Sequence, residues 1–186
     1  MANLILIGPP GVGKSTVATW IQALTNRNRV SLDDRGHPFH ASRLPGYHTS
    51  ALHPSMVGFM AAYRTWKPFE IESVEKHLQA VDNHVIDFGA GHSVYEDPVQ
   101  FERAATALRG HHVALLLPDQ SIDRSRVILS EQHPSQDPEG IKFIEHVLAH
   151  PSNTRVANVI VTREAKTPKE VAKEVLAHFP TWFAFA

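Results

Sequence analysis

The 186-residue sequence contains no cysteine. This absence excludes disulfides, thiolate metal sites and cysteine nucleophiles, and it fits a protein of a reducing compartment. No apolar run approaches the ~20 residues that a membrane-spanning helix needs, and the apolar segment 2–7 is too short for the core of a signal peptide. We therefore expect a cytoplasmic protein that does not bind membranes.

An excess of charge of either sign is also missing. The 18 Lys and Arg residues nearly balance 19 Asp and Glu, which gives a formal net charge of −1. Without a basic excess or a run of Lys and Arg, broad electrostatic attraction to nucleic acid is not expected. Composition and length fit one globular domain over residues 1–186. Nothing in the sequence indicates an oligomeric state.

Short apolar segments alternate with segments of helical periodicity. This alternation predicts a three-layer α/β fold, with helices on both faces of a parallel sheet. The expected strands span residues 2–7, 29–32, 84–88, 112–117 and 156–161. The expected helices span residues 14–25, 55–66, 68–81, 98–109, 121–130, 141–149 and 168–178, the last capped by Thr167 and Glu170.

A glycine-rich segment joins the first strand to the first helix. Residues 8–15 read GPPGVGKS and match the phosphate-binding pattern G-x-x-x-x-G-K-[ST] in full. Backbone N–H groups of such a loop converge on phosphates at a helix N-terminus, while the lysine reaches the β- and γ-phosphates and the serine binds Mg²⁺. A chance glycine turn is the alternative. We expect ATP and Mg²⁺ to bind at Gly8, Gly11, Val12, Gly13, Lys14, Ser15 and Thr16.

Carboxylates follow two other strands. Asp33 and Asp34 end the second strand, where one can act on Mg²⁺ and the other can accept a proton from a substrate hydroxyl. Solvated turn residues or a helix cap are the alternative. Asp87 lies within the third strand and must be paired or bind metal, because an apolar strand leaves a carboxylate unsolvated. Asp87 is accordingly a Mg²⁺ ligand, a catalytic base or a structural buried residue.

The acceptor side has weaker signals. Gly89, Ala90 and Gly91 follow the third strand and either let a substrate approach the backbone or form a plain turn. Arg64 is either a clamp for an anionic acceptor or a surface ion-pair partner. The histidines at 37, 40, 48 and 53 have no known metal-ligand spacing, so we expect them to line a substrate loop or to be solvated.

On these motifs the chain resembles the shikimate kinase and nucleoside-monophosphate kinase branch of P-loop proteins. The resemblance implies a sheet of order 2-3-1-4-5, a substrate-side insertion at about 37–66 and a lid at about 130–140. It also implies transfer of the γ-phosphoryl of ATP to a hydroxyl of a small molecule. Asp33 or Asp34 would then position Mg²⁺ or the acceptor, Gly89 and Arg64 would hold the acceptor, and Pro168 would lie near the adenine.

The sequence departs from shikimate kinases in ways that bear on the acceptor. The two Asp residues are contiguous, Ala90 replaces a glycine, and residues 127–154 contain no arginine, although these kinases use lid arginines. Arg124 or Arg126 would have to replace them. The leading hypothesis is therefore a kinase with an acceptor other than shikimate. The alternative is a nucleotide-dependent switch with slow hydrolysis, and phosphorylation of a nucleotide or activated sugar is a third option.

Overall fold

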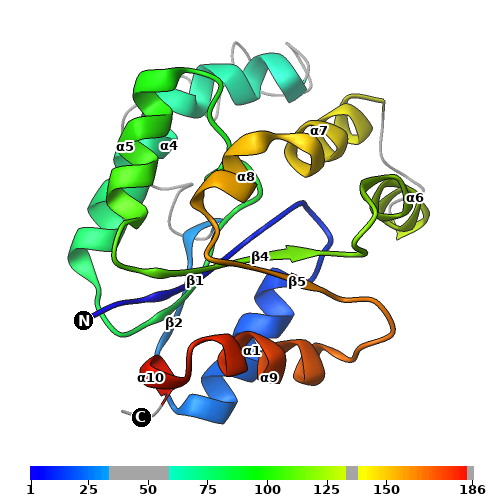
Figure 1. Cartoon of the computed structure of the whole chain (residues 1–186). Helices are drawn as coiled ribbons and strands as arrows, with labels where there is room; N and C mark the ends of the chain where they lie inside the picture. The colour runs from blue at the N-terminus through cyan, green and yellow to red at the C-terminus, as the bar shows by residue number, and fades with distance from the viewer. Residues whose placement is uncertain (34–58, 133–137, 184–186) are drawn as a thin grey trace.

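The computed structural model describes residues 1–33, 59–132 and 138–183 (Figure 1). Its centre is a five-stranded sheet in the order β2-β3-β1-β4-β5, and the paired strands are parallel. The sheet order predicted from the family resemblance is therefore confirmed. The strands are β1 (Leu4–Ile7), β2 (Arg29–Ser31), β3 (Val85–Asp87), β4 (His112–Leu117) and β5 (Val159–Thr162).

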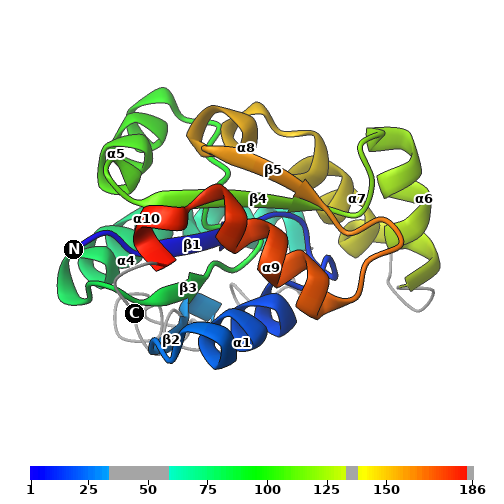
Figure 2. The ribbon, with the colours of Figure 1, turned by 60° about the horizontal axis from the view of Figure 1, so that its bottom comes forward.

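Helices cover both faces of this sheet, as predicted (Figures 1 and 2). One face carries α1, α9 and α10, and the other carries α4, α5, α7 and α8. The helices are α1 (Lys14–Thr25), α4 (Phe59–Ala80), α5 (Pro98–Leu108), α6 (Ile122–Gln132), α7 (Pro138–Ala149), α8 (Pro151–Val156), α9 (Pro168–His178) and α10 (Pro180–Phe183).

The central strand β1 buries every side chain, because alternate residues point to opposite faces of the sheet. Leu4 and Leu6 pack in the apolar cluster beneath α1 and α9. Ile5 and Ile7 pack in the cluster beneath α4, α5 and α7. All four are fully buried, as expected for a strand covered on both faces. The carboxyl end of β1 is thereby held rigidly where the glycine-rich loop begins.

One helical prediction was wrong. The sequence predicts helices at 55–66 and 68–81, whereas the structure has one helix, α4, with Pro68 inside it. A proline inside a helix costs about 3 kcal/mol, because it removes a backbone hydrogen bond and crowds the preceding turn. Buried side chains on both sides of it, Tyr63 and Ala62 before and Ile71 and Val74 after, offset that cost. The predicted break is overridden by tertiary packing.

Other boundaries bear on the predicted insertion and lid. Residues 59–66 of the predicted insertion form the first part of α4, and residues 37–58 lie outside the described residues. The ends of the predicted lid at 130–140 are helical, in α6 and α7, and its centre at 133–137 also lies outside the description. The short helix α8 was not predicted. Thr167 and Glu170 form the predicted capping box at α9.

No helix in the described ranges is long and apolar enough to cross a membrane.

Candidate nucleotide-binding and active site

The loop between β1 and α1 has the backbone conformation that its glycines permit. Gly8, Gly11 and Gly13 have φ values of 140°, 77° and 96°, a region that residues with a Cβ rarely adopt. A Cβ on Gly8 would also lie 2.3 Å from the carbonyl oxygen of Leu116 in β4. Gly13 caps α1 without a side-chain hydrogen bond to the helix. The first N–H groups of α1 are thus left for an anionic ligand.

Lys14 lies inside this loop. Its Nζ donates hydrogen bonds to the carbonyl oxygens of Gly8, at 2.9 Å, and Pro9, at 3.0 Å. Burial lowers the pKa of the ammonium to about 8, although the nearby carboxylates of Asp33 and Asp87 act in the opposite direction. Phosphate oxygens would stabilise this buried ammonium more strongly than the two neutral carbonyl oxygens do.

Asp87, at the end of β3, is held by two partners. The guanidinium of Arg29 donates from Nε to Oδ1 at 2.9 Å and from Nη2 to Oδ2 at 3.0 Å. The Ser15 hydroxyl donates to Oδ2 at 2.8 Å. Both carboxylate oxygens of Asp87 thus accept hydrogen bonds from protein groups. The geometry therefore favours a role in positioning Ser15 and binding a metal over the catalytic-base role among the predicted options.

This oxygen pair fits Mg²⁺. In P-loop proteins the metal is held by the loop Ser or Thr hydroxyl and by an acidic residue at a neighbouring strand end. Ser15 Oγ and the Asp87 carboxylate are the corresponding hard oxygen donors, and they already lie within hydrogen-bond distance. The residues present therefore suit a Mg²⁺ ion, with Asp33 as the further predicted ligand.

Asp33 reaches the same edge of the sheet from the end of β2. Its side chain is 67% exposed, and its Oδ1 lies 3.9 Å from Nδ1 of His92. The carboxylate lies directly over Gly89, because a Cβ built there would fall 1.8 Å from Asp33 Oδ1. The structure thus brings Lys14, Asp33, Asp87 and Gly89 together. Asp34, the other half of the predicted pair, lies outside the described residues.

We expect Gly89→Ala to impair catalysis without unfolding the protein. The new Cβ would fall 1.8 Å from Asp33 Oδ1 and 2.4 Å from His92 Nδ1, so the exposed Asp33 carboxylate and the buried His92 ring would both have to shift. The backbone at position 89 is not in the left-handed region and adds no strain. The expected result is a loss of kcat by roughly tenfold to a hundredfold, together with a loss of about 1–3 kcal/mol of stability from the displaced ring, in a protein that stays folded. Val99→Ala is a control, because this side chain is 69% exposed on α5, away from the phosphate loop. Unchanged steady-state kinetics in Gly89→Ala would contradict a role for Asp33.

Sequence reasoning missed His92. The side chain is 5% exposed, and neither ring nitrogen has a hydrogen-bond partner among the described residues. Burial, the largest influence, lowers its pKa, so the ring is held neutral beside Asp33. Its position directly after the Gly89–Gly91 turn was the one available signal.

Sequence reasoning also missed Lys67, which is buried beneath that turn. Its Nζ donates to Glu70 Oε2 at 2.6 Å and to the carbonyl oxygen of Gly91. The ammonium also lies 4.3 Å from the ring centroid of Tyr63. A Cβ on Gly91 would approach the Tyr63 ring to 2.9 Å. Gly91 is therefore needed for packing against α4, whereas Gly89 faces Asp33.

The predicted arginines Arg124 and Arg64 lie in different parts of the fold. Arg124 is 69% exposed and forms ion pairs with Asp119 at 3.3 Å and Glu164 at 4.0 Å. Arg64 lines a pocket of about 640 Å³ between α4 and α7, together with Arg126. Arg163 was not predicted, but its Nη1 lies 4.0 Å from the position of a Cβ on Gly13. A guanidinium from the end of β5 therefore lies beside the phosphate loop.

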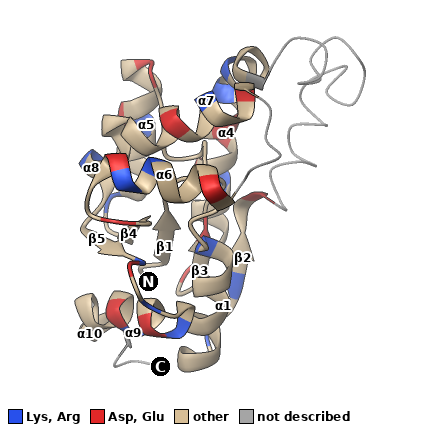
Figure 3. Ribbon diagram, turned by 90° about the vertical axis from the view of Figure 1, so that its right-hand side faces the viewer, with Lys and Arg blue, Asp and Glu red and all other residues tan. Residues whose placement is uncertain are grey.

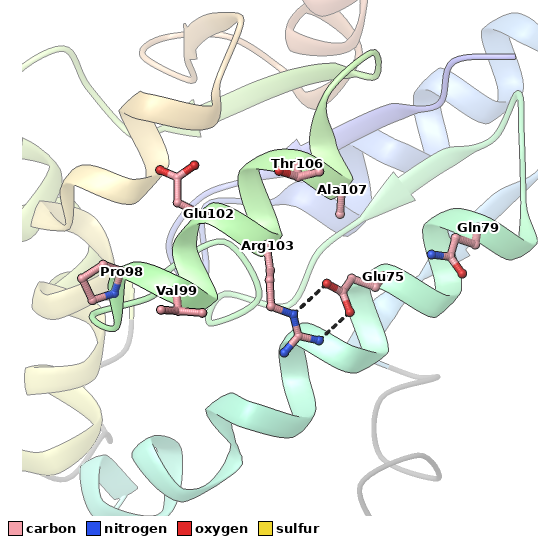
Figure 4. A pocket seen from close by; sticks show the side chains of 8 residues that line it. All are labelled: Glu75, Gln79, Pro98, Val99, Glu102, Arg103, Thr106 and Ala107. Carbon is pink, nitrogen blue, oxygen red and sulfur yellow. Dashed lines mark hydrogen bonds and ion pairs between the residues drawn. The ribbon is translucent and has the colours of Figure 1, made fainter.

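Neither the surface charge nor the groove between α4 and α5 indicates a second candidate for the nucleotide site. Acidic and basic segments are interspersed on the side that carries α6 and α7 (Figure 3). A groove of about 590 Å³ lies between α4 and α5, where Arg103 and Glu75 form a bidentate ion pair (Figure 4). All of its lining residues come from those two helices, so the groove is no part of the nucleotide site. Pro168, predicted near the adenine, is the first residue of α9.

Solved structures have the same architecture over nearly the whole chain. Shikimate kinase from Acinetobacter baumannii, in complex with shikimate, has a TM-score of 0.66 at 15% identity, covering 97% of this chain and 94% of that one. Shikimate kinase from Aquifex aeolicus has a TM-score of 0.59 at 19% identity, covering 96% of each chain. A gluconokinase from Sinorhizobium meliloti has a TM-score of 0.58 at 15% identity, covering 98% and 94%.

The chain has the fold of the shikimate kinases. No family model matches it, and no curated protein does. Because these identities lie below 20%, the likeness to shikimate kinases establishes the fold and leaves the chemistry to the site. The phosphate loop and the ends of β2 and β3 occupy the edge where open α/β sheets bind their ligands.

Proposed function

We propose that the protein is a kinase that transfers the γ-phosphoryl group of ATP to a hydroxyl of a small molecule. This proposal rests on one observation: two groups of side chains, suited to different functions, lie at the same edge of the sheet. Lys14 and the Ser15–Asp87 pair form a donor side, and Asp33 over Gly89 forms a carboxylate on the acceptor side. The structures of a shikimate kinase and a gluconokinase, which share the fold, support this assignment.

Each of these residues has its own role in phosphoryl transfer, a reaction in which positioning and charge stabilisation dominate catalysis. The loop N–H groups and Lys14 bind the phosphates, and Arg163 lies close enough to the loop to neutralise further charge. Mg²⁺, held through Ser15 and Asp87, would supply additional charge stabilisation. Asp33, with a largely exposed carboxylate, orients the acceptor hydroxyl and receives its proton.

The acceptor we propose is a hydroxyl compound other than shikimate. The buried cation beneath the glycine turn, Lys67, is already neutralised by Glu70 and is engaged by the carbonyl of Gly91. It is therefore poorly placed to bind an acceptor carboxylate. Arg64 lines the α4–α7 pocket, which also contains the carboxylates of Glu139 and Glu145. This arrangement favours a neutral polyol or sugar.

A panel of acceptors tests the proposal. The purified protein, ATP and Mg²⁺ would be incubated with sugars, polyols, sugar acids and shikimate, and ADP formation would be followed. We expect at least one neutral hydroxyl compound to raise ADP formation at least tenfold above the acceptor-free rate. An unchanged slow rate with every compound, together with tight ATP binding, would instead support the nucleotide-dependent switch.

Nucleotide binding is expected to take up a proton at alkaline pH. In the free protein burial holds the pKa of Lys14 at about 8, and phosphate oxygens would raise it by stabilising the ammonium. Above that pKa the free protein must gain a proton to bind, so affinity falls as pH rises. Between about pH 7.5 and about pH 9 we expect the ATP dissociation constant to increase roughly tenfold.

Isothermal titration in buffers of different ionisation enthalpy measures both the affinity and the proton uptake. The Lys169→Met variant provides a comparison, because this lysine lies in α9 over the Trp20 ring and should leave the pH profile unchanged. A dissociation constant that is constant over the same range would contradict the assignment of Lys14.

A further inference from the structure

Three potential metal ligands meet away from the phosphate loop. Glu96 precedes α5, His146 lies in the last turn of α7, and His150 caps the start of α8. One ligand atom from each lies within 4.8 Å of the others. His146 Nε2 and Glu96 Oε1 are 2.6 Å apart, and the two imidazole rings are 5.1 Å apart between centroids.

The break between α7 and α8 brings the two histidines together. His146 lies in the last turn of α7, and His150 lies outside that helix as the extended N-cap of α8. Glu96 is brought to them over 50 positions of sequence. Two imidazoles and a carboxylate are ligands typical of Zn²⁺ and related transition metals, whereas Mg²⁺ prefers an all-oxygen shell.

The hydrogen bonds and the exposure of the side chains are compatible with metal binding. His150 Nδ1 accepts a hydrogen bond from the Ser152 N–H at 3.2 Å, so this nitrogen carries a lone pair. The side chains of His146 and Glu96 are 26% and 42% exposed, so an ion can reach them from solvent.

We propose that Glu96, His146 and His150 form a binding site for a divalent transition metal of the Zn²⁺ type. The metal replaces the proton shared between His146 and Glu96, and it replaces the long cap bond from Ser152 to His150. Ligand atoms about 2.0–2.1 Å from a tetrahedral Zn²⁺ are roughly 3.3 Å apart. Side-chain rotations that move the ligand atoms by about an ångström would therefore bring them to bonding distance of one ion. Three protein ligands leave a fourth position for water.

The site joins elements that also border the proposed acceptor region. It ties α7 and α8 to the segment before α5. The Tyr63 ring from α4 packs against His146 with centroids 5.8 Å apart, and the same ring lies beneath Lys67. A bound metal would therefore stabilise the packing of α7 on α4. The site is independent of the proposed phosphotransfer, since none of its three ligands lies in the phosphate loop or at Asp33.

Metal titration of the chelator-treated protein tests the proposal. We would measure Zn²⁺ affinity by competition with a chromogenic chelator, and coordination by the visible spectrum of the Co²⁺ form, both in excess Mg²⁺. We expect one site with a four-coordinate Co²⁺ spectrum. His146→Ala and His150→Ala should each weaken Zn²⁺ binding at least a hundredfold. His178→Ala, an exposed histidine in α9, should leave the affinity unchanged.

The Glu96→Gln variant distinguishes loss of a metal ligand from misfolding, because the amide keeps a hydrogen bond to His146 but is a poor metal ligand. We expect this variant to lose Zn²⁺ affinity at least tenfold while its circular dichroism spectrum and apo melting temperature stay close to the parent values. Zn²⁺ binding and a Co²⁺ spectrum that are the same in the parent and in all three ligand variants would overturn the proposal. Absence of Zn²⁺ binding by the parent would overturn it as well and would leave Glu96 and His146 as an ion pair.

Discussion

Replacing Lys14 with methionine is expected to lower kcat/KM for ATP by at least about a thousandfold, the largest effect of any single change in the site. Methionine keeps an unbranched apolar stem but removes the charge that meets the phosphates. The loss should appear in both nucleotide affinity and turnover, because the ammonium interacts with bound ATP and more strongly with the transferring phosphoryl group.

The fold should survive this substitution. Within the described part of the chain, Lys14 Nζ donates its hydrogen bonds to the carbonyls of Gly8 and Pro9, and removing a buried charge relieves an unfavourable desolvation. We expect a melting temperature equal to or above that of the parent protein. Steady-state kinetics and thermal denaturation measured on Lys14→Met and on Lys169→Met separate the two effects. Parent-like kinetics in Lys14→Met would contradict the nucleotide site.

Asp87→Asn is expected to have the second largest effect, lowering kcat by roughly a hundredfold to a thousandfold. The amide fits the same space, but it lacks the charge that would hold Mg²⁺ and the second carboxylate oxygen that accepts from both Ser15 and Arg29. Removal of one member of a largely buried ion pair should also lower the free energy of unfolding by about 1–3 kcal/mol.

Arg29→Met is the matched variant for this prediction. It breaks the same ion pair and should destabilise the protein by a similar amount, but it leaves the Asp87 carboxylate in place. We therefore expect its kcat to fall less than tenfold under conditions where it is folded. Chemical denaturation and initial rates would be compared for both variants. Equal losses of kcat in the two would assign Asp87 to the fold rather than to the site.

The strand–loop–helix conformation around Lys14 could be predicted from the sequence because its information is local. Eight consecutive residues, 8–15, specify a strand–loop–helix turn whose glycines and lysine are required by phosphate geometry. The sheet order followed from the family resemblance and is confirmed. The buried Asp87 was recognised as needing a partner, because a carboxylate in an apolar strand cannot stay unpaired.

The partners themselves could not be predicted, because they come from distant segments. Arg29 reaches Asp87 across neighbouring strands, 58 positions away. Lys67 meets Gly91 because α4 continues through Pro68, which local propensity predicts as a break. Both ring nitrogens of His92 are buried without a hydrogen-bond partner in the described part of the chain, and this burial comes from the surrounding elements. Gly89 and Gly91 are the same residue type, but Gly89 faces Asp33 and Gly91 faces the Tyr63 ring, which the sequence does not show.

The most direct test of the proposed function is to follow the γ-phosphoryl group itself. ATP carrying ¹⁸O in its γ-phosphate would be incubated with the protein, Mg²⁺ and the acceptor identified in the panel, and the products would be analysed by mass spectrometry. We predict a labelled phosphate monoester of the acceptor, formed one for one with ADP and absent with Lys14→Met. Label found only in inorganic phosphate, at a rate independent of the acceptor, would contradict the proposal.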